Sequence, residues 1–533
     1  MAKHIFVIGG VLSSLGKGIA SASIGFLLNR MGYKIGMQKL DPYLNVDPGT
    51  MSPYQHGEVY VTEDGGEADL DLGHYERYIG QSTSKASNAT SGVIYEKVIQ
   101  KERRGEYDGN TVQVIPHVTD EIKLMFRKIS ENKDIVFTEI GGTVGDIEIL
   151  PFLEAIRQYR FEIGLQNSLV IFLTYVPYMK AAGESKSKPA QHSIIKLREI
   201  GIQPDIILCR TEKDFDEDIT SKIALYSNVP YTHVKAAVDT DCVYEIPKNF
   251  YNAGIHELIC NHFNLEIKPV DFSVWDEFIY NKDNPECEAN LIMCGKYVEH
   301  QDAYISVDEA IKHAAALNKI KINIISVDSE KYFTTKEYDE LFKNANGVLV
   351  PGGFGPRGID GKIDIINYAR VNNIPFLGIC LGMQLAVIEF ARNVCGLDDA
   401  FSTEFQENCL DPIINLSHKI KVDGTYAGIM RLGAYPCHLK EGSMAKKLYS
   451  SDTAQERHRH RYELNNKYRD LLEENGMYIT GTSPDGLLTE IIEIPKNHFF
   501  IGVQFHPEFQ SRPDKPHDLF VGFIKAIKER VQS

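Results

Sequence analysis

The chain has 533 residues, a hydrophobic content of 43% and a formal net charge of −16. One hydrophobic core rarely serves a chain of this length, so we expect two or more domains. The acidic balance argues against a general nucleic-acid binder, which needs clustered Lys and Arg, and no apolar run has the length of a membrane span. The nine cysteines form no C-x-x-C pair, which favours free thiols and a reducing, cytoplasmic location.

The first predicted elements are a strand, a glycine-rich loop and a helix. The apolar run HIFVI precedes GGVLSSLGKG (residues 9–18), and a helical pattern follows. This order resembles a phosphate-binding loop, whose standard pattern is G-x-x-x-x-G-K-[ST]. Gly18 stands where the standard loop has a hydroxyl, and Gly10 lies one residue too early. Because the usual magnesium hydroxyl is missing, we expect carboxylates to hold the metal, while Ser13 and Ser14 offer hydroxyls to phosphates.

Two acidic residues are candidates for that metal. Asp71 lies in EADLDLGHYER, where acids alternate with apolar residues, and Glu139 ends the predicted strand DIVFTE before IGGTVGD. A carboxylate at the carboxyl end of a strand lies where an α/β sheet binds its ligands. In each case the alternative is an ordinary acid on the protein surface.

Short β-branched runs alternate with helical patterns along nearly the whole chain. Strands interleaved with helices indicate parallel α/β sheets, so the expected fold class is α/β with two parallel-sheet domains. The pattern lapses in a stretch with prolines, charges and the only tryptophan, Trp275. We therefore predict a first domain over 1–266, a linker over 267–288 and a second domain over 289–533. The strands are predicted at 4–10, 34–40, 134–142, 167–176, 204–210, 290–297, 321–328, 346–353 and 374–380.

A cysteine in the second half lies at a predicted strand-to-helix turn. Gly378 and Gly382 flank Cys380 in FLGICLGMQLAVIEFAR, with the spacing of a nucleophile elbow. Close glycines permit a sharp turn, and the helix N-terminus favours the thiolate over the thiol. The alternative is a buried cysteine in a glycine-rich turn.

Two further motifs favour catalysis. IGVQFHPEF places His506 and Glu508 two residues apart after a strand, so both side chains point to one side of an extended segment. A cysteine nucleophile needs a base and a carboxylate that orients the base, and these two residues are candidates for those roles. VLVPGGFG carries Gly352 and Gly353, whose backbone N–H groups suit a developing oxyanion. With the elbow, these motifs resemble the class I glutamine amidotransferase family over roughly 289–533.

That resemblance implies a glutaminase reaction. Cys380 attacks the side-chain amide of glutamine to form a thioester and release ammonia, His506 moves the proton, and Glu508 orients His506. The oxyanion donors fall on the backbone N–H groups of Gly353 and Leu381. Arg461 lies in ERHRHRYELN, otherwise a solvated charged stretch, and its planar fork suits the substrate carboxylate. The implied glutamine-binding residues are Gly353, Leu381, Gly382, Met383, Gln384, Glu404 and Arg461.

Longer strings in the first half have a more specific resemblance. They include KLDPYLNVDPGTMSP, QHGEVYVTEDGGEADLDLGHYERY, KERRGEYDGNTVQVIPHVT, EIGGTVGDIE and SKSKPAQHSI. Together with the second half they resemble the CTP synthase family over almost all of 1–530. The implied reaction is ATP-dependent phosphorylation of the 4-oxo oxygen of UTP, followed by displacement of that phosphate by ammonia. An ammonia passage between the domains is implied as well.

The resemblance also implies the nucleotide sites. Asp71 and Glu139 hold Mg²⁺, and Lys17 and Lys39 face the phosphates of ATP. The lysine-rich ESKSKPAQ suits a triphosphate, although it is otherwise typical of a mobile solvated loop. The implied ATP-binding residues are Ser14, Leu15, Gly16, Lys17, Gly18, Ile19, Lys39, Asp71, Val238, Asp239 and Thr240. The implied UTP- and CTP-binding residues are Ser13, Asp146, Ile147, Glu148, Lys186, Ser187, Lys188, Pro189, Ala190, Gln191 and Lys222.

The family further implies effectors and an assembly. CTP inhibits at a site that shares the triphosphate positions of UTP, GTP activates glutamine hydrolysis, and the enzyme is a homotetramer. Neither a nucleic acid nor a membrane is an expected partner. One alternative is another P-loop amidoligase with a fused glutaminase and a carboxylate acceptor, such as a cobyrinate a,c-diamide or cobyric acid synthase. A second is a non-catalytic P-loop switch, which does not explain an intact Cys-His-Glu set.

Overall fold

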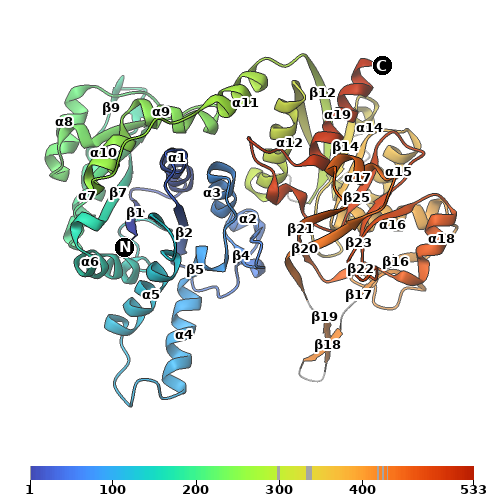
Figure 1. Cartoon of the computed structure of the whole chain (residues 1–533), viewed down its shortest axis with the longest axis horizontal. Coiled ribbons are helices and arrows are strands. Elements are labelled where there is room, and N and C mark those ends of the chain that lie inside the picture. The colour runs from blue at the N-terminus through green and yellow to red at the C-terminus, as the bar shows by residue number, and fades with distance from the viewer. Residues whose placement is uncertain (1, 297–299, 332–338, 417–418, 423–424, 429) are drawn as a thin grey trace. The chain divides into compact units, whose positions relative to one another are not determined.

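The computed structural model describes residues 2–296, 300–331, 339–416, 419–422, 425–428 and 430–533 (Figure 1). The chain forms two compact units. The first comprises Met1–Met51 and Ala68–Ser273, and the second comprises Ser52–Glu67 and Val274–Ser533. A short segment of the first half, Ser52–Glu67, therefore belongs to the second unit. The sequence-based boundaries assign this segment to the first domain, and those boundaries stay a prediction.

A seven-stranded parallel sheet forms the centre of the first unit, in the order β11-β10-β7-β1-β6-β2-β5. Every residue of β2 and β6 is buried, as expected for a parallel sheet covered on both faces. The five strands predicted in this half are present, whereas β5 and β11 are short and escaped prediction. The strands are β1 (Lys3–Gly9), β2 (Ile35–Asp41), β5 (Asn88–Thr90), β6 (Ile135–Ile140), β7 (Ser168–Tyr175), β10 (Ile206–Thr211) and β11 (Val234–Val238).

Helices cover both faces of this sheet (Figure 1). Phe6 and Ile8 of β1 belong to one core, together with Phe126 and Phe152 from two helices. Ile5 and Val7 alternate with them and are equally buried, so they face the opposite layer. The first layer contains α4 (Ser91–Arg103), α5 (Thr119–Ile129), α6 (Leu150–Ile163), α7 (Lys188–Glu199) and α8 (Glu217–Ser227). The second contains α1 (Lys17–Arg30), α3 (Asp71–Ile79), α9 (Ile246–Asn252) and α10 (Ile255–Phe263).

The second unit has a nine-stranded sheet in the order β13-β12-β14-β15-β25-β24-β23-β20-β21. Its first five strands are parallel, as predicted, and the last four extend the sheet with antiparallel pairs. The parallel strands are β12 (Cys287–Gly295), β13 (Ile320–Asp328), β14 (Gly347–Val350), β15 (Phe376–Ile379) and β25 (Phe500–Val503). The antiparallel strands are β20 (Arg431–Leu439), β21 (Thr453–His460), β23 (Tyr478–Thr482) and β24 (Thr489–Glu493).

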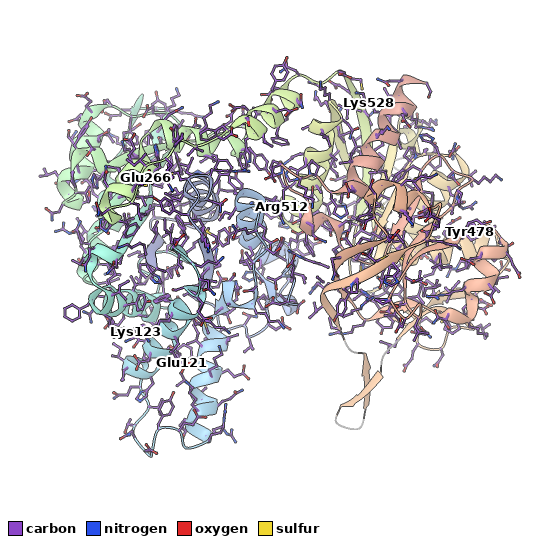
Figure 2. All side chains as sticks on the ribbon, viewed as in Figure 1. Glu121, Lys123, Glu266, Tyr478, Arg512 and Lys528 are labelled. Atoms are coloured by element: carbon purple, nitrogen blue, oxygen red, sulfur yellow. The ribbon has the colours of Figure 1, made fainter. Side chains whose placement is uncertain are left out.

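Two cores lie on the two faces of this second sheet. Val348 and Val350 of β14 belong to the core beneath α15 (Ile359–Val371) and α16 (Leu381–Asn393). Leu349 belongs to the opposite core, with α12 (Ile305–Leu317), α17 (Met444–Tyr449) and α19 (Asp518–Gln532). Lys528 lies on α19 (Figure 2). Its Nζ donates to the Asn318 carbonyl at 2.8 Å, which connects α19 to the end of α12.

Smaller elements complete the second unit. They are α2 (Pro53–His56), α14 (Asp339–Lys343), α18 (Arg469–Glu474), the three-stranded sheet of β16 (Ala400–Ser402), β17 (Asp411–Leu416) and β22 (Tyr462–Leu464), and the hairpin of β18 (Lys419–Val422) and β19 (Thr425–Gly428). The predicted linker holds α11 (Ser273–Asp283), in which Trp275 is only 2% exposed. In the described part of the chain, no helix combines the length and the apolar character that crossing a membrane requires.

Candidate active sites

The glycine-rich loop leads from β1 into α1, which begins at Lys17. Gly16 precedes the helix with a φ of 83°, a conformation that costs glycine little. Val11 and Ser14 also have positive φ, at 81° and 57°. Such a backbone is unfavourable for residues other than glycine, and strain of this kind concentrates at ligand-binding loops.

The Lys17 side chain turns back from the helix to the carboxyl edge of the sheet. Its Nζ donates to the Gly142 carbonyl at 3.0 Å, and its stem packs so tightly on Gly9 that a Cβ there would lie 2.9 Å from Lys17 Cδ. Burial lowers the pKa of Lys17, against the opposing effect of Glu139 and Asp71. The amine is therefore fixed beside the N-terminus of α1, where a phosphate would bind.

The unusual Gly18 has a direct steric reason. A Cβ at this position would lie 1.9 Å from Asp71 Oδ1 and 2.8 Å from Asp71 Cγ, so any side chain here would displace the Asp71 carboxylate from its present position. The carboxylate of Asp71, the first residue of α3, fills the space that a Ser or Thr side chain takes in the standard loop. The loop thus offers a carboxylate where the standard loop offers a hydroxyl.

Lys39 of β2 connects the two predicted metal ligands. Its Nζ bonds Asp71 Oδ2 and, at 3.0 Å, Glu139 Oε1, and it lies 3.9 Å from Asp41. The Tyr75 hydroxyl donates to the other oxygen of Glu139. Burial raises the pKa of Glu139, whereas Lys39 holds the pKa of Asp71 below its usual range despite burial. Sequence reasoning did not identify Asp41 or Tyr75, although Asp41 ends the same strand as Lys39.

The donor set fits Mg²⁺ only together with a nucleotide. Mg²⁺ is usually bound by one or two carboxylates plus phosphate oxygens and water. Asp71 and Glu139 would supply the carboxylates, and burial in a region of excess negative charge favours a divalent cation. Among the residues that the structure describes, no group of three or more His, Cys, Asp and Glu side chains could hold a metal ion alone. Phosphate oxygens would have to complete the coordination.

A cavity of about 720 Å³ opens beside this loop in the first unit. Arg210 lines this cavity, donates to the Ser14 carbonyl at 2.8 Å and pairs with Asp239 at 2.9 Å. Apolar walls with a few polar groups suit the base of a nucleotide. The cavity brings together residues from both predicted ATP-binding stretches, namely Leu15, Gly16, Ile19, Val238, Asp239 and Thr240.

The residues predicted for UTP are less concentrated. Asp146 follows β6, and its Oδ2 accepts bonds from the backbone and hydroxyl of Thr143, at 2.9 and 2.7 Å. The stretch Lys186–Gln191 leads into α7, which packs on the glycine-rich loop: a Cβ at Gly10 would lie 2.7 Å from Ser193 Cβ. Ile147 is 80% exposed, and Lys222 lies on α8, where it pairs with Asp218. The described contacts do not bring Lys222 to the other predicted UTP residues.

In the second unit, Cys380 occupies the turn between β15 and α16 with a φ of 51°. A Cβ at Gly382 would lie 2.1 Å from the Val350 carbonyl oxygen, and one at Gly378 would lie 2.8 Å from the Gly382 carbonyl carbon. Both glycines are therefore sterically required. The structure has the sharp turn that the G-x-C-x-G spacing predicts.

His506 and Glu508 meet in a different way from the one predicted. The segment after β25 does not stay extended but enters a 3₁₀ turn at Pro507–Gln510, which still brings His506 Nδ1 to 2.7 Å from Glu508 Oε1. Burial alone would lower the pKa of His506, but Glu508 and Cys380 outweigh it and raise that pKa to about 10. A Cβ at Gly352 would lie 2.8 Å from His506 Cε1, so the Gly352–Gly353 loop lies against the His506–Glu508 pair.

The residues predicted to bind glutamine surround this elbow. Glu404 Oε1 accepts a bond from the Gly355 backbone at 2.9 Å, and Lys296 donates to the Phe354 carbonyl at 2.6 Å. Burial raises the pKa of Glu404, and Arg461, exposed between β21 and β22, is among the cations that oppose the rise. Sequence reasoning did not identify Lys296 as a residue of this site, although Lys296 directly follows β12, one of the predicted strands. Leu381, Gly382, Met383 and Gln384 form the first turn of α16.

The stretch ERHRHRYELN is not the solvated charged stretch that its composition alone would favour. Its first part belongs to β21 and its second part to β22, and Arg457, His458 and His460 of β21 are almost wholly buried. Arg457 donates to the Tyr60 hydroxyl and the Val61 carbonyl, both at 3.0 Å. Its own carbonyl accepts the backbone N–H of His506 at 2.8 Å. The segment Ser52–Glu67 thus contacts the strand that bonds to the backbone of His506.

Comparisons with known proteins cover both halves of the chain. The family model described as CTP synthase N-terminus matches residues 3–265, and the one described as glutamine amidotransferase class-I matches residues 299–526. The CTP synthase of Aquifex aeolicus is 54% identical over 529 residues, 99% of each chain. That of Methanocaldococcus jannaschii is 53% identical over 530 residues, 98% of each chain. The solved glutaminase domain of Trypanosoma brucei CTPS, with bound acivicin, is 36% identical, with a TM-score of 0.43, over 45% of this chain and 94% of that one.

Proposed function

This chain belongs to the CTP synthase family and catalyses glutamine-dependent formation of CTP, and on that premise we propose how its two units divide the reaction. The first unit uses ATP to phosphorylate the 4-oxo oxygen of UTP, and the second hydrolyses glutamine to supply ammonia. The observation that supports this division is that each unit has its own site: a phosphate loop beside a cavity in one, and a cysteine elbow beside a His-Glu pair in the other. The relatives that match over 98% or more of both chains are CTP synthases, which argues against a carboxylate acceptor and against a non-catalytic switch.

In the second unit, Cys380 is the nucleophile. Its sulfur attacks the side-chain carbonyl carbon of glutamine, and the backbone N–H groups of Gly353 and Leu381 stabilise the oxyanion. His506, held by Glu508, gives its proton to the departing ammonia. Water then adds to the thioester, His506 takes up its proton, and glutamate leaves. Glu404 and Arg461 bind the charged groups of the substrate, with Leu381, Gly382, Met383 and Gln384 around them.

In the first unit, the chain's own residues position two nucleotides. Lys17 and Lys39 place positive charge on the transferred phosphoryl group, and the cavity beside Arg210 holds the base of ATP. Asp71 and Glu139 would hold Mg²⁺, which when bound offsets the charge on the phosphate oxygens. Transfer of the γ-phosphoryl to UTP yields ADP and 4-phosphorylated UTP. Ammonia then attacks C4, the phosphate leaves with the former 4-oxo oxygen, and CTP results.

The proposal includes partners whose support is the family resemblance. UTP binds through Ser13, Asp146–Glu148, Lys186–Gln191 and Lys222, and CTP inhibits by sharing the triphosphate positions. GTP activates glutamine hydrolysis, and the enzyme works as a homotetramer in the cytoplasm. The nine cysteines are free thiols in the structure, in keeping with a reducing compartment.

The fate of the UTP 4-oxygen tests the proposed intermediate. UTP labelled with ¹⁸O at that position should transfer the label to inorganic phosphate in step with CTP formation. Label in water and none in phosphate would rule out phosphorylation of the 4-oxo group, while CTP synthesis itself would stand.

Asp71→Asn and Glu139→Gln are expected to raise the magnesium requirement of CTP formation about tenfold or more, the usual scale for losing support of a metal. The reason is that each variant removes a charged oxygen from a site with two carboxylates. The measurement is CTP formation from ammonia across a magnesium titration, with Glu131→Gln, an exposed acid before β6, as the matched control. An unchanged magnesium dependence in both variants would count against the assignment.

Gly18→Ser tests whether the Asp71 carboxylate takes the place of the hydroxyl in the standard phosphate loop. It restores the hydroxyl of the standard loop, yet its Cβ would collide with Asp71 Oδ1, 1.9 Å away in the present structure. We therefore expect lower activity and a higher magnesium requirement rather than a gain. A variant with normal activity at the same magnesium concentration would show that Asp71 does not need its place beside Gly18.

A further inference from the structure

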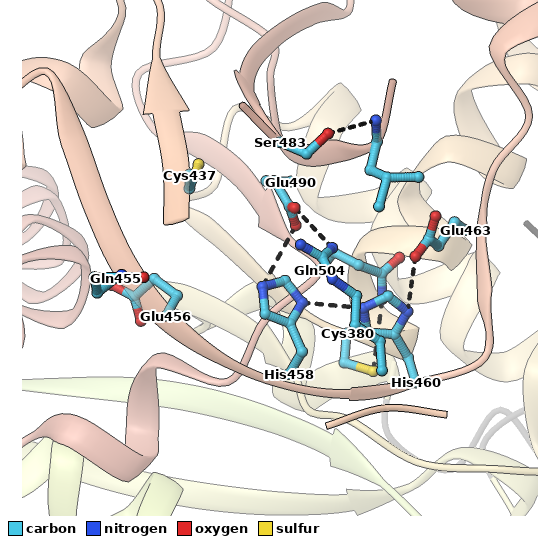
Figure 3. Close-up of polar contacts among 12 residues, drawn as sticks. Cys380, Cys437, Gln455, Glu456, His458, His460, Glu463, Ser483, Glu490 and Gln504 are labelled. Carbon is cyan, nitrogen blue, oxygen red and sulfur yellow. Dashed lines mark hydrogen bonds and ion pairs between the residues drawn. The ribbon is translucent and has the colours of Figure 1, made fainter. Parts of the chain in front are cut away.

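Gln504 lies between β25 and His506, is wholly buried, and touches the catalytic sulfur. Its Nε2 is 3.7 Å from Cys380 Sγ (Figure 3). The backbone carbonyl of Arg459 lies 3.8 Å from the same sulfur. A thiol can donate its proton to that carbonyl, but a thiolate cannot, so the ionised sulfur depends on other donors.

Hydrogen bonds fix which end of the Gln504 amide faces the sulfur. Gln384 Nε2 donates to the Tyr462 carbonyl at 2.9 Å, and a backbone carbonyl accepts only. The same Nε2 is 3.2 Å from the Gln504 amide, whose nearer end must therefore be the acceptor Oε1. The opposite end, the Nε2 amino group, consequently points at Cys380. This orientation follows from the network and not from the arbitrary choice between amide O and N.

Buried histidines hold the other end of this network. His460 Nδ1 lies 3.2 Å from the Tyr462 carbonyl, so it carries the proton and His460 Nε2 is an acceptor. His458 Nδ1, 3.0 Å away, supplies that bond (Figure 3). Burial lowers the pKa of both rings, which keeps each neutral with one proton, as the bonds require. The Tyr462 carbonyl therefore accepts bonds from Gln384 Nε2 and His460 Nδ1. Because a carbonyl cannot donate, the Gln384 amide cannot turn its oxygen toward it without losing a bond.

We propose that Gln504 is a further catalytic residue of the glutaminase reaction: its amide N–H donates to Cys380 Sγ and favours the thiolate that attacks glutamine. Gln384 acts as a positioning residue, because it orients that amide. The inference rests on the proposed role of Cys380 as nucleophile. His506 and Glu508 also act in this reaction, but the proton of His506 passes to the departing ammonia. The amide of Gln504 keeps its protons, so it can donate to the thiolate at every step of the reaction.

The test measures the thiolate directly in the full-length protein. Iodoacetamide alkylation of Cys380 is followed against pH by mass spectrometry of its peptide, because the thiolate is the form that reacts. Gln504→Met keeps the side-chain length and removes the donor; Gln504→Glu turns an acceptor toward the sulfur. We expect the midpoint of the alkylation profile to rise by about one pH unit in Gln504→Met and further in Gln504→Glu. Glutamine hydrolysis should fall about a hundredfold, the lower end of the loss typical when one donor to a developing charge is removed.

Controls separate this role from packing and from the proposed function. Gln455→Met, on the exposed side of β21, should leave the profile unchanged, and ammonia-dependent CTP formation should survive in all three variants. A Gln504→Met protein with an unshifted alkylation midpoint would overturn the inference, whatever its activity, because losing a donor to the thiolate must raise the midpoint. If the unsubstituted protein failed to hydrolyse glutamine, the proposed function would fail instead.

Discussion

Cys380→Ala is expected to abolish CTP formation from glutamine while CTP formation from ammonia continues at the rate of the unsubstituted enzyme. The sulfur is the only heavy atom that the variant removes, and it is the proposed nucleophile, which Gln504 Nε2 approaches at 3.7 Å. Removing a nucleophile typically costs about a thousandfold or more in turnover, so glutamine hydrolysis should fall to background. Alanine fits the positive φ of the elbow no worse than cysteine does, so the second unit should keep its fold. The measurement is CTP formation with each nitrogen source, together with glutamate release.

Cys395→Ala is the matched control for this experiment. Cys395 is a half-buried free cysteine just beyond the same helix, α16, and it has no place in the proposed chemistry. It should use both nitrogen sources normally. An equal loss of both activities in Cys380→Ala, with the fold intact, would mean that Cys380 does not serve glutamine hydrolysis alone.

Lys17→Ala should remove CTP formation from both nitrogen sources. The ammonium of Lys17 is fixed on the Gly142 carbonyl beside Asp71 and Glu139, and alanine leaves no cation there. Loss of a preorganised charge that faces a transferred phosphoryl group typically costs about a hundredfold to a thousandfold. Glutamate release measured without nucleotides should persist, because the elbow belongs to the other unit.

Lys34→Ala, an exposed lysine before β2 in the same unit, is the control for lost charge. It should retain full activity. Normal ammonia-dependent turnover in Lys17→Ala would refute the assignment of the loop to ATP and would leave the cavity beside Arg210 without its proposed ligand.

The parts of the sites that depend on local geometry could be predicted from the sequence. Long apolar runs marked the central strands, and the glycines at 378 and 382 marked an elbow because only glycine fits there. The missing hydroxyl at Gly18 pointed to a carboxylate elsewhere, and Asp71 is found in that space. The proximity of Lys39 to Asp71 and Glu139 follows from neighbouring parallel strands and the helix beyond them.

Contacts between distant parts of the chain escaped prediction. Arg457 and His458 have the composition of a surface, yet β21 buries them because Tyr60, Val61 and Glu490 supply partners from elsewhere. Nothing local in Ser52–Glu67 indicates that this segment packs with the second unit. Gln504 also escaped attention, because its role depends on a neighbour, Gln384, that lies 120 residues away.

The most direct test of the two-site account is CTP formation by the purified full-length protein with UTP, ATP and Mg²⁺, comparing glutamine with ammonia, each with and without GTP. The account predicts CTP from both nitrogen sources, with GTP stimulating only the use of glutamine. CTP from glutamine but none from saturating ammonia would contradict the account, because the synthetase unit would then lack the independent ammonia-using site that the division of labour requires.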